Sequence, residues 1–315
     1  MTEQTQTQRK VKVDLHMHGP IGLQEFWLKD QGYGGKNLLR LIADSCLDKG
    51  VGITAITSDE DEIPRGSIHD RFNYLINKFA LTLPKGYEFS RFGKNIGIVA
   101  RSDEQLFILN AQNVRTNDEG KQVGYNVIGT NKIPNHRDLV ETIKLVNDKN
   151  SDEEGYLIGG PEHAFCDAHH GIVVKERLAK LLPLMSFVEG HDAQMIWNVS
   201  EKIPVFGKYR RGINDLAQEF AQNYKKPWIA VSNAHRIKDA GIAYVEFDFD
   251  KLDMTNPAKF SKSLKTVVES NEFTNHCGYQ SKAGWLDWVS SYAWGTKLGL
   301  DKKSEREMRQ NKTWN

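Results

Sequence analysis

Segments with the pattern of β-strands alternate with segments with the pattern of helices along most of this chain, and no other feature restricts the fold as much. The first strand is expected at Lys10–His16, where Val11, Val13 and Leu15 alternate with polar residues. The first helix is expected at Asn37–Lys49, with its apolar residues on one face. Strands that are joined through helices pair in parallel, so the sequence predicts a parallel β/α architecture.

The same alternation continues to the last third of the chain. Further strands are expected at Val51–Thr57, Tyr87–Ser90, Asn95–Ala100, Tyr156–Gly160, Ser186–Glu189, Trp228–Ser232 and Ala243–Phe249. Further helices are expected at Asp70–Leu81, His136–Asp148, Val174–Leu182, Ile213–Asn223 and Pro257–Ser270. The strands at 87–90 and 95–100 are expected to form a hairpin, and the polar stretches 118–122 and 147–155 to form surface loops. About seven strands of the parallel type indicate a TIM-like barrel with an incomplete strand count.

Composition limits the class of protein further. The 315 residues suit one large barrel or two medium domains, and a net charge of +1 gives no support for a nucleic-acid or membrane partner. No apolar run is long enough to span a bilayer, and Met1–Lys10 lacks the apolar core of a secretory signal. Cys46, Cys166 and Cys277 are odd in number and far apart, so we expect a reducing, cytoplasmic location.

These patterns divide the chain into three parts: a flexible leader at 1–10, a barrel at 11–283 and a helical extension at 284–315. The extension contains four tryptophans, at 285, 288, 294 and 314. Aromatic residues at helical spacing usually pack on a core, so we expect the extension to pack on the barrel. An interaction surface is the alternative.

Residues 14–18 read Asp-Leu-His-Met-His and give the clearest chemical signal. Residues two apart on a strand share a face, so His16 and His18 can point at one cation. They lie at the end of the first strand, where β/α barrels build their sites, and imidazole is the commonest protein ligand for transition metals. Two surface histidines would be the alternative.

Other strand ends contain residues of the same kinds. Asn233 and His235 follow the strand at 228–232, and Asp59 stands in an acidic run after the strand at 51–57. Glu88 lies in the strand at 87–90, and a carboxylate there could complete a histidine site. A loop at 159–170 contains His163 among three histidines. Turn chemistry or a solvated acidic loop would explain these residues without a metal.

Together, these segments resemble the PHP (polymerase and histidinol phosphatase) family of metallophosphoesterases. The matching segments, in order, are Asp14–His18, Gly50–Glu60, Tyr87-Glu88, Leu157–Pro161, Phe187–Glu189 and Ser232–His235. They span most of the chain, from about Val11 to Phe249. The sequence departs from the family pattern at Ser58-Asp59 (usually Asp-His), at Gly160 (usually His) and at Asn233 (usually Asp). The histidine that usually follows the first pair is also missing, and Gln24 lies near its place.

The resemblance implies a distorted TIM-like (β/α)7 barrel with divalent metals at its C-terminal mouth. It implies metal ligation by His16, His18, Glu88, Asn233 and His235. Asp59 and His163 are candidate replacement ligands, as are Glu60, Asp167 and His169. Because so many ligands are changed, we expect only one or two ions of Mn, Fe or Zn.

The same resemblance implies hydrolysis of phosphate monoesters or diesters by metal-bound hydroxide. Asp59 would be a general base and His235 a general acid or second-metal ligand, with Arg65, Arg91 or Arg101 holding phosphate. The substrate would be a phosphorylated small molecule, a nucleotide or a nucleic-acid end. One alternative is a catalytically inactive barrel that serves as a binding or assembly module with at most one metal. Another is a C–N hydrolase of the amidohydrolase type, which explains Glu88 less well.

Overall fold

A large mixed sheet forms the centre of the computed structural model, which describes residues 9–18, 36–59, 70–149, 155–166, 171–172, 174–195, 212–287 and 290. Its strands are β1 (Lys10–Met17), β2 (Val51–Ser58), β3 (Tyr87–Arg91), β4 (Ile96–Arg101), β5 (Glu104–Asp118), β6 (Lys121–Ile128), β7 (Ile158–Pro161), β10 (Tyr244–Asp248) and β11 (Thr274–His276). The order is β11-β10-β1-β2-β5-β4-β3, and β6 joins β5 to β7. Two further strands, β8 (Val188–Asp192) and β9 (Trp228–Val231), form a separate parallel pair.

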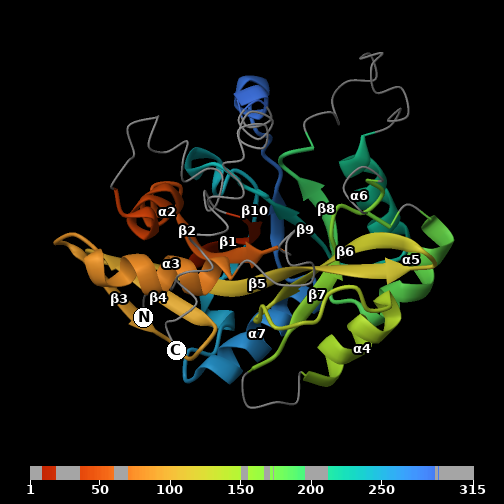
Figure 1. Ribbon diagram of the computed structural model, residues 1–315, viewed down its shortest axis with the longest axis horizontal. Helices are drawn as coiled ribbons and strands as arrows, with labels where there is room; N and C mark the ends of the chain where they lie inside the picture. The colour runs from red at the N-terminus through yellow and green to blue at the C-terminus, as the bar shows by residue number, and fades with distance from the viewer. Residues whose placement is uncertain are drawn as a thin grey trace, which may run out of the picture.

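Helices cover the outside of this sheet (Figure 1). They are α2 (Leu38–Leu47), α3 (Arg71–Phe79), α4 (Leu139–Asp148), α5 (Lys175–Leu181), α6 (Ile213–Asn223) and α7 (Pro257–Glu269), with short 3-10 turns at Ala80–Thr82, Leu182–Leu184, Ile237–Asp239 and Phe249–Lys251. Side chains of Asn37, Asp70, Asp138 and Asn256 accept hydrogen bonds from the first turns of α2, α3, α4 and α7, which fixes where these helices begin. No helix in the described part of the chain is long and apolar enough to cross a membrane.

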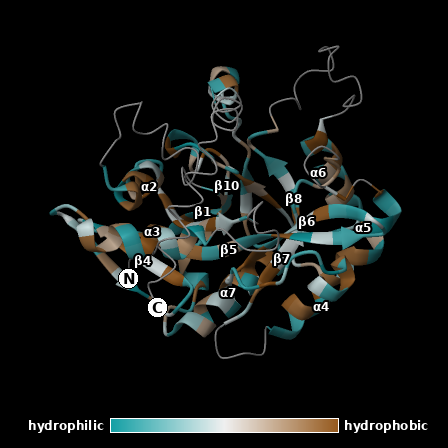
Figure 2. Ribbon diagram, in the orientation of Figure 1, coloured by the Kyte–Doolittle hydropathy of each residue, from teal (hydrophilic) through white to brown (hydrophobic). Residues whose placement is uncertain are grey.

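Apolar side chains from both sheets meet in one interior cluster. Val13 on β1, Ile53 on β2, Leu109 on β5 and Val231 on β9 belong to it, and Phe260 on α7 packs into it. The outer face of the large sheet is covered by α2 and α3 at one end and by α4 and α5 at the other, while α6 packs against β8 of the small sheet. Hydrophobic and hydrophilic residues accordingly share the surfaces of α3 and α4 (Figure 2). The large sheet therefore curves around a core to which the small sheet contributes.

The predicted closed barrel is not found in the described residues. The ladder is replaced by isolated backbone hydrogen bonds at two places. Ser186 N donates to Gly159 O (2.7 Å) at one, and Asn233 N donates to His16 O (2.8 Å) and His18 N to Ala234 O (3.1 Å) at the other. The prediction of about seven strands of the parallel type is also wrong, because β4–β5, β5–β6, β6–β7 and β1–β10 are antiparallel. The fold shown is a mixed α/β structure.

Short connections explain two of these antiparallel pairs, β4–β5 and β5–β6. Only Glu119 and Gly120 separate β5 from β6, and both have positive φ angles, as in a tight hairpin turn. A parallel crossover needs a dozen or more residues, so two residues force an antiparallel return. The stretch 118–122, predicted to be a surface loop, is therefore this turn with the ends of two strands that the sequence analysis missed.

The surroundings of Gly160 show why a histidine, usual at this place in the PHP family that the sequence resembles, does not fit here. A Cβ atom on Gly160 would lie 2.6 Å from Cε2 and 2.7 Å from the backbone oxygen of Phe187, which is fully buried. We expect Gly160→Ala to lower the free energy of unfolding by about 1–3 kcal/mol through overpacking. Urea denaturation measures this change. The matched control is Gly52→Ala, whose nearest contact is the Val11 side chain at 3.0 Å. If Gly160→Ala loses no more free energy of unfolding than Gly52→Ala, the result would show that Phe187 moves aside easily.

Candidate metal centre

The first and last sequence motifs meet at the end of β1. The buried Asp14 carboxylate accepts hydrogen bonds from the backbone N–H groups of Ser232 (3.1 Å) and Gly241 (3.1 Å). Asn233 N donates to His16 O (2.8 Å), which adds a backbone link between the same segments. Burial raises the pKa of Asp14 to about 6, although these hydrogen bonds oppose the shift. Asp14 therefore joins the two segments that contain the predicted histidines.

His16 and His18 face one another inside the protein. Both side chains are buried, and their Nε2 atoms lie 3.0 Å apart. The β1–β2 register shifts between Asp14 and Met17, an irregularity that re-aims side chains near the end of a strand. The sequence prediction that the two imidazoles share a face is confirmed.

The other nitrogen of each imidazole lies beside a carboxylate. Nδ1 of His16 is 2.8 Å from Oε1 of Glu189 on β8, and Nδ1 of His18 is 3.2 Å from Oδ2 of Asp59 after β2. Burial alone would lower the pKa of His16, but the charge and hydrogen bond of Glu189 raise it. Burial lowers the pKa of His18, and Asp59 offsets part of that effect.

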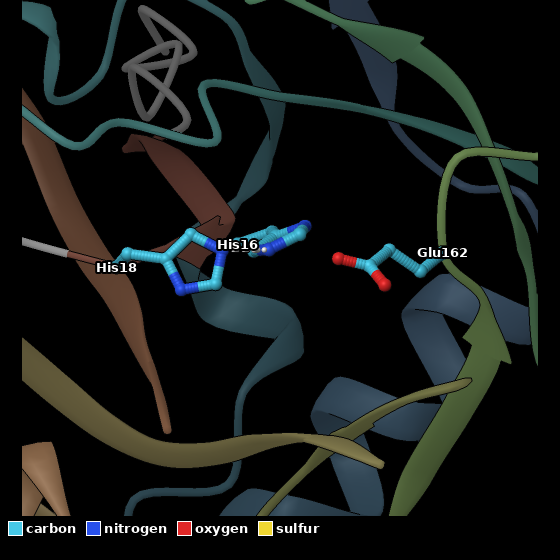
Figure 3. A group of neighbouring side chains, drawn as sticks. All are labelled: His16, His18 and Glu162. Carbon is cyan, nitrogen blue, oxygen red and sulfur yellow. Dashed lines mark hydrogen bonds between the residues drawn. The ribbon is translucent and has the colours of Figure 1, made fainter. Parts of the chain in front are cut away.

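Glu162, directly after β7, supplies a carboxylate opposite this pair (Figure 3). One oxygen of Glu162 and one nitrogen of each histidine all lie within 4.8 Å of one another. Arg115 donates to Glu162 Oε2 (3.0 Å), and Asn113 donates to Oε1. Burial would raise the pKa of Glu162, but the charges of Arg115 and His163 hold it well below its usual range. The carboxylate is therefore ionised and fixed in place.

A second group of possible ligands adjoins the first. His163, Glu189 and Asp192 are buried and offer atoms within 4.8 Å of one another. Nδ1 of His163 lies 2.6 Å from Asp192 Oδ2, and its Nε2 lies 3.2 Å from Glu162 Oε1. Burial would lower the pKa of His163, but Glu162 and Asp192 raise it well above its ordinary value. The two groups thus share the neighbourhood of Glu162.

Buried oxygens without hydrogen-bond partners lie around these groups and suit a cation. In the described part of the chain, the Oδ1 atoms of Asp59, Asn113, Asn126 and Asn233 are buried and have no hydrogen-bond partner. A buried polar atom left unsatisfied costs about 1–3 kcal/mol, so four beside one cluster need an explanation. Two imidazoles and a carboxylate are ligands that Zn, Fe and Mn share. The residues present therefore fit a divalent metal.

Asn233 and His235 lie at the centre, as predicted. Asn233 has a positive φ of 45°, and its Nδ2 donates to Asp192 Oδ2 (3.0 Å). The ring of His235 stacks on that of His18 with centroids 4.4 Å apart. Burial, His18 and Arg71 hold the pKa of His235 well below its ordinary value. A neutral imidazole suits a ligand or proton acceptor better than the predicted general acid.

Glu88 is not at the centre, and the prediction that it converges with the histidines is wrong. It is exposed on β3, the edge strand, and β4, β5 and β2 separate β3 from β1. At about 4.8 Å per strand, this separation is roughly 19 Å. The physical reason is that β3 and β4 form an antiparallel hairpin on the outer edge instead of contributing a strand beside β1.

The predicted phosphate-binding arginines are also misplaced. Arg91 is exposed on β3, and Arg101 pairs with Asp44, Asp48 and Glu104 on the surface. Arg71 and Arg115 stand near the histidines instead, beside Asp59 and Glu162. Residues 24, 60, 65, 167 and 169, which the sequence analysis also considered, lie outside the described residues.

The sequence analysis missed several residues of the centre. Glu162, Glu189 and Asp192 were not proposed as ligands, although Glu162 directly follows β7 and Asp192 is the last residue of β8. The strand-end position that drew attention to Asn233 could have indicated these two as well. Asn126, which donates to Glu189, gave no signal because β6 was not predicted.

Comparisons with known proteins agree with this picture. Residues 212–265, which contain β9, Asn233 and His235, match the family model described as PHP-associated. This match confirms the resemblance predicted from the sequence and is consistent with a PHP-domain protein. The crystal structure of PsfC from Pseudomonas syringae PB-5123 is similar over 92% of this chain and 99% of that one, with a TM-score of 0.55 and 11% identity. At that identity the similarity concerns the fold alone. No curated protein matches the sequence.

Two matched glutamate substitutions test the composition of the centre. We expect Glu162→Gln to weaken Mn²⁺ or Zn²⁺ binding, because it removes a buried negative charge from the group that contains His16 and His18. Glu88→Gln should leave binding unchanged, because Glu88 is exposed on the edge strand. Titration against a chelating dye measures both affinities. Weaker binding in Glu88→Gln alone would contradict the arrangement described.

Proposed function

We propose that this chain, a member of the PHP family by its PHP-associated region, is a divergent metal-dependent phosphoesterase. The observation that carries the proposal is the pair of Nε2 atoms of His16 and His18, 3.0 Å apart, with the Glu162 carboxylate opposite. In the metal-free protein one proton can bridge these two nitrogens as a hydrogen bond, and without that proton their lone pairs face each other in an arrangement that a cation stabilises. Two imidazoles and one carboxylate leave further positions of a metal open for water and substrate.

The residues of the centre have separate proposed roles. His16, His18 and Glu162 would hold the first cation, and His163 and Asp192 of the second group would contribute to a second where one binds. When bound, Mn, Fe or Zn supplies Lewis-acid activation of water and of the phosphoryl oxygens. Asn233 would complete the ligand set. His235 would complete it as well or accept a proton.

Cationic side chains near the centre support an anionic substrate. Arg71 lies beside Asp59, and Arg115 lies beside Glu162, so each guanidinium is close to a residue of the proposed site. Guanidinium groups bind phosphate through charge-assisted hydrogen bonds. The substrate class proposed is therefore a phosphate monoester or diester, on a small molecule, a nucleotide or a nucleic-acid end.

A distorted barrel is the finer fold that we propose with this function. One backbone hydrogen bond joins the segment before β8 to β7, and two join the segment after β9 to the end of β1. The isolated parallel bridge between Met17 and Ala234 supports the same closure. Apart from Glu189, the residues of both candidate groups stand at or just after strand ends, where barrels of this type form their sites.

Hydrolysis of phosphate esters tests the function. We expect the wild-type protein to hydrolyse at least one member of a panel of aryl phosphates, nucleotides and short oligonucleotides, with stimulation by Mn²⁺ and inhibition by a chelator. The double substitution of His16 and His18 by Ala should remove both bound metal and activity. It should leave a cooperative thermal transition, because the apolar core supplies the stability of the fold.

Glu88→Gln is the control and should keep wild-type activity. Activity that survives the double substitution would come from another site or a contaminant. A wild-type protein that binds metal but hydrolyses no ester would contradict the phosphoesterase and support a binding module.

A further inference from the structure

In the proposed first ligand group, each histidine has a carboxylate beside the ring nitrogen that faces away from the other histidine. A carboxylate only accepts hydrogen bonds, so Nδ1 of His16 is the donor to Glu189. The Asp59 carboxylate lies 3.2 Å from Nδ1 of His18 without hydrogen-bond geometry, and its charge favours a proton on that nitrogen too. In the neutral ring, Nε2 then bears the lone pair. The contacts of Glu189 with His16 (2.8 Å) and of Asp59 with His18 (3.2 Å) thus turn both lone pairs toward each other.

The Asp59 carboxylate is itself fixed. Arg71 places Nη2 2.9 Å from Asp59 Oδ2 and donates through Nη1 to the backbone oxygen of His18 (3.2 Å). The backbone N–H of Arg71 donates to Ser58 Oγ (3.2 Å). The start of α3 is thereby connected to the end of β2 and to His18, and one guanidinium holds both the carboxylate and the histidine backbone.

The Glu189 carboxylate is fixed in a similar way. Its Oε1 accepts hydrogen bonds from Asn126 Nδ2 as well as from His16, and its Oε2 accepts one from the backbone N–H of His163 (3.0 Å). Three donors from β6, β1 and the segment after β7 therefore occupy its oxygens. This arrangement suits an acceptor that orients a ring.

We infer that Asp59 and Glu189 are positioning residues that fix the tautomer and orientation of His18 and His16 for a divalent cation. The inference rests on the proposed metal site. It gives Asp59 a different role from the replacement ligand or general base expected from the sequence. Asp59 belongs to neither group of three whose ligand atoms lie within 4.8 Å. Carboxylates that orient ligating histidines in this way raise their basicity.

Metal affinity distinguishes these roles. Metal-free Asp59→Asn and Asp59→Ala proteins would be titrated with Zn²⁺ against a chelating dye, and with Co²⁺ to record its visible spectrum. Loss of an orienting partner typically costs 10–100-fold in metal affinity. We expect Asp59→Asn, which keeps the size and an accepting oxygen, to lose about 10-fold, and Asp59→Ala about 100-fold. The number of ions per chain and the shape of the Co²⁺ spectrum should not change.

Asp48→Asn is the matched control, because Asp48 is exposed and pairs with Arg101 on the surface. It should bind metal as the wild type does. Glu189→Gln should lower affinity about 10-fold at unchanged stoichiometry. Loss of one of two ions in that variant would make Glu189 a ligand of the second group and overturn its positioning role.

Other outcomes overturn the role of Asp59. Unchanged affinity with lost activity in Asp59→Asn would make it a general base. An affinity loss of well over 100-fold, with an altered spectrum of the Co²⁺ that still binds at high concentration, would make it a ligand.

Nitrogen NMR of the metal-free imidazoles at alkaline pH separates this inference from the proposed function. We expect His18 to carry its proton on Nδ1 in the wild type and to shift toward the Nε2–H form in Asp59→Ala. A wild-type protein that shows this tautomer but binds no metal would refute the proposed function, while a wild type with Nε2–H rings would refute the positioning role.

Discussion

The buried Asp14 carboxylate is the interaction on which the centre depends. Its hydrogen bonds to Ser232 and Gly241 join the end of β1 to the segment after β9, more than two hundred positions along the chain. Without that link, His16 and His18 would have no fixed relation to Asn233 and His235. A buried carboxylate that accepts several backbone N–H groups is costly to remove, because the donors would lose their partners. The first residue of the opening motif therefore contributes structure, and the histidines after it contribute chemistry.

The centre also depends on how its charges are paired. Glu162 and Asp59 each contact an arginine, Arg115 and Arg71 respectively. An isolated buried carboxylate would become protonated and lose its value as a ligand or hydrogen-bond acceptor. Despite burial, His18 and Arg71 hold the pKa of Asp59 well below its ordinary range, and Arg115 and His163 do the same for the pKa of Glu162. The arginines thus preserve the negative charge that a divalent cation requires.

Sequence patterns predicted the parts of this structure that local chemistry determines. The strands β1 and β2 and helix α6 fall close to their expected bounds, because each has a clear apolar period and clear ends. The long β5–β6 hairpin was missed, since its polar residues do not alternate cleanly and its tight turn resembles a loop. The antiparallel order of the sheet was missed for the same reason.

The site was predicted where two residues share one short motif and missed where it depends on tertiary contacts. His16 and His18 are neighbours through strand geometry alone. Glu88 occupies the right place in the sequence, yet the edge hairpin takes it away from the histidines. Glu162 reaches the centre through the pairing of β6 with β7, which no local pattern indicates.

The departures from the family pattern make physical sense as a set. Asn233 stands where the family has an acid, and its amide donates to Asp192 at 3.0 Å. An aspartate at 233 would place two carboxylates at that distance, and like charges so close cannot both stay ionised without a cation between them. Gly160 stands where the family has a histidine, and Phe187 fills the space that a side chain would need. Asp192 and Glu162 meanwhile bring negative charge from neighbouring strand ends. These differences from the family pattern therefore place the negative charge of the centre at other residues and do not only remove it.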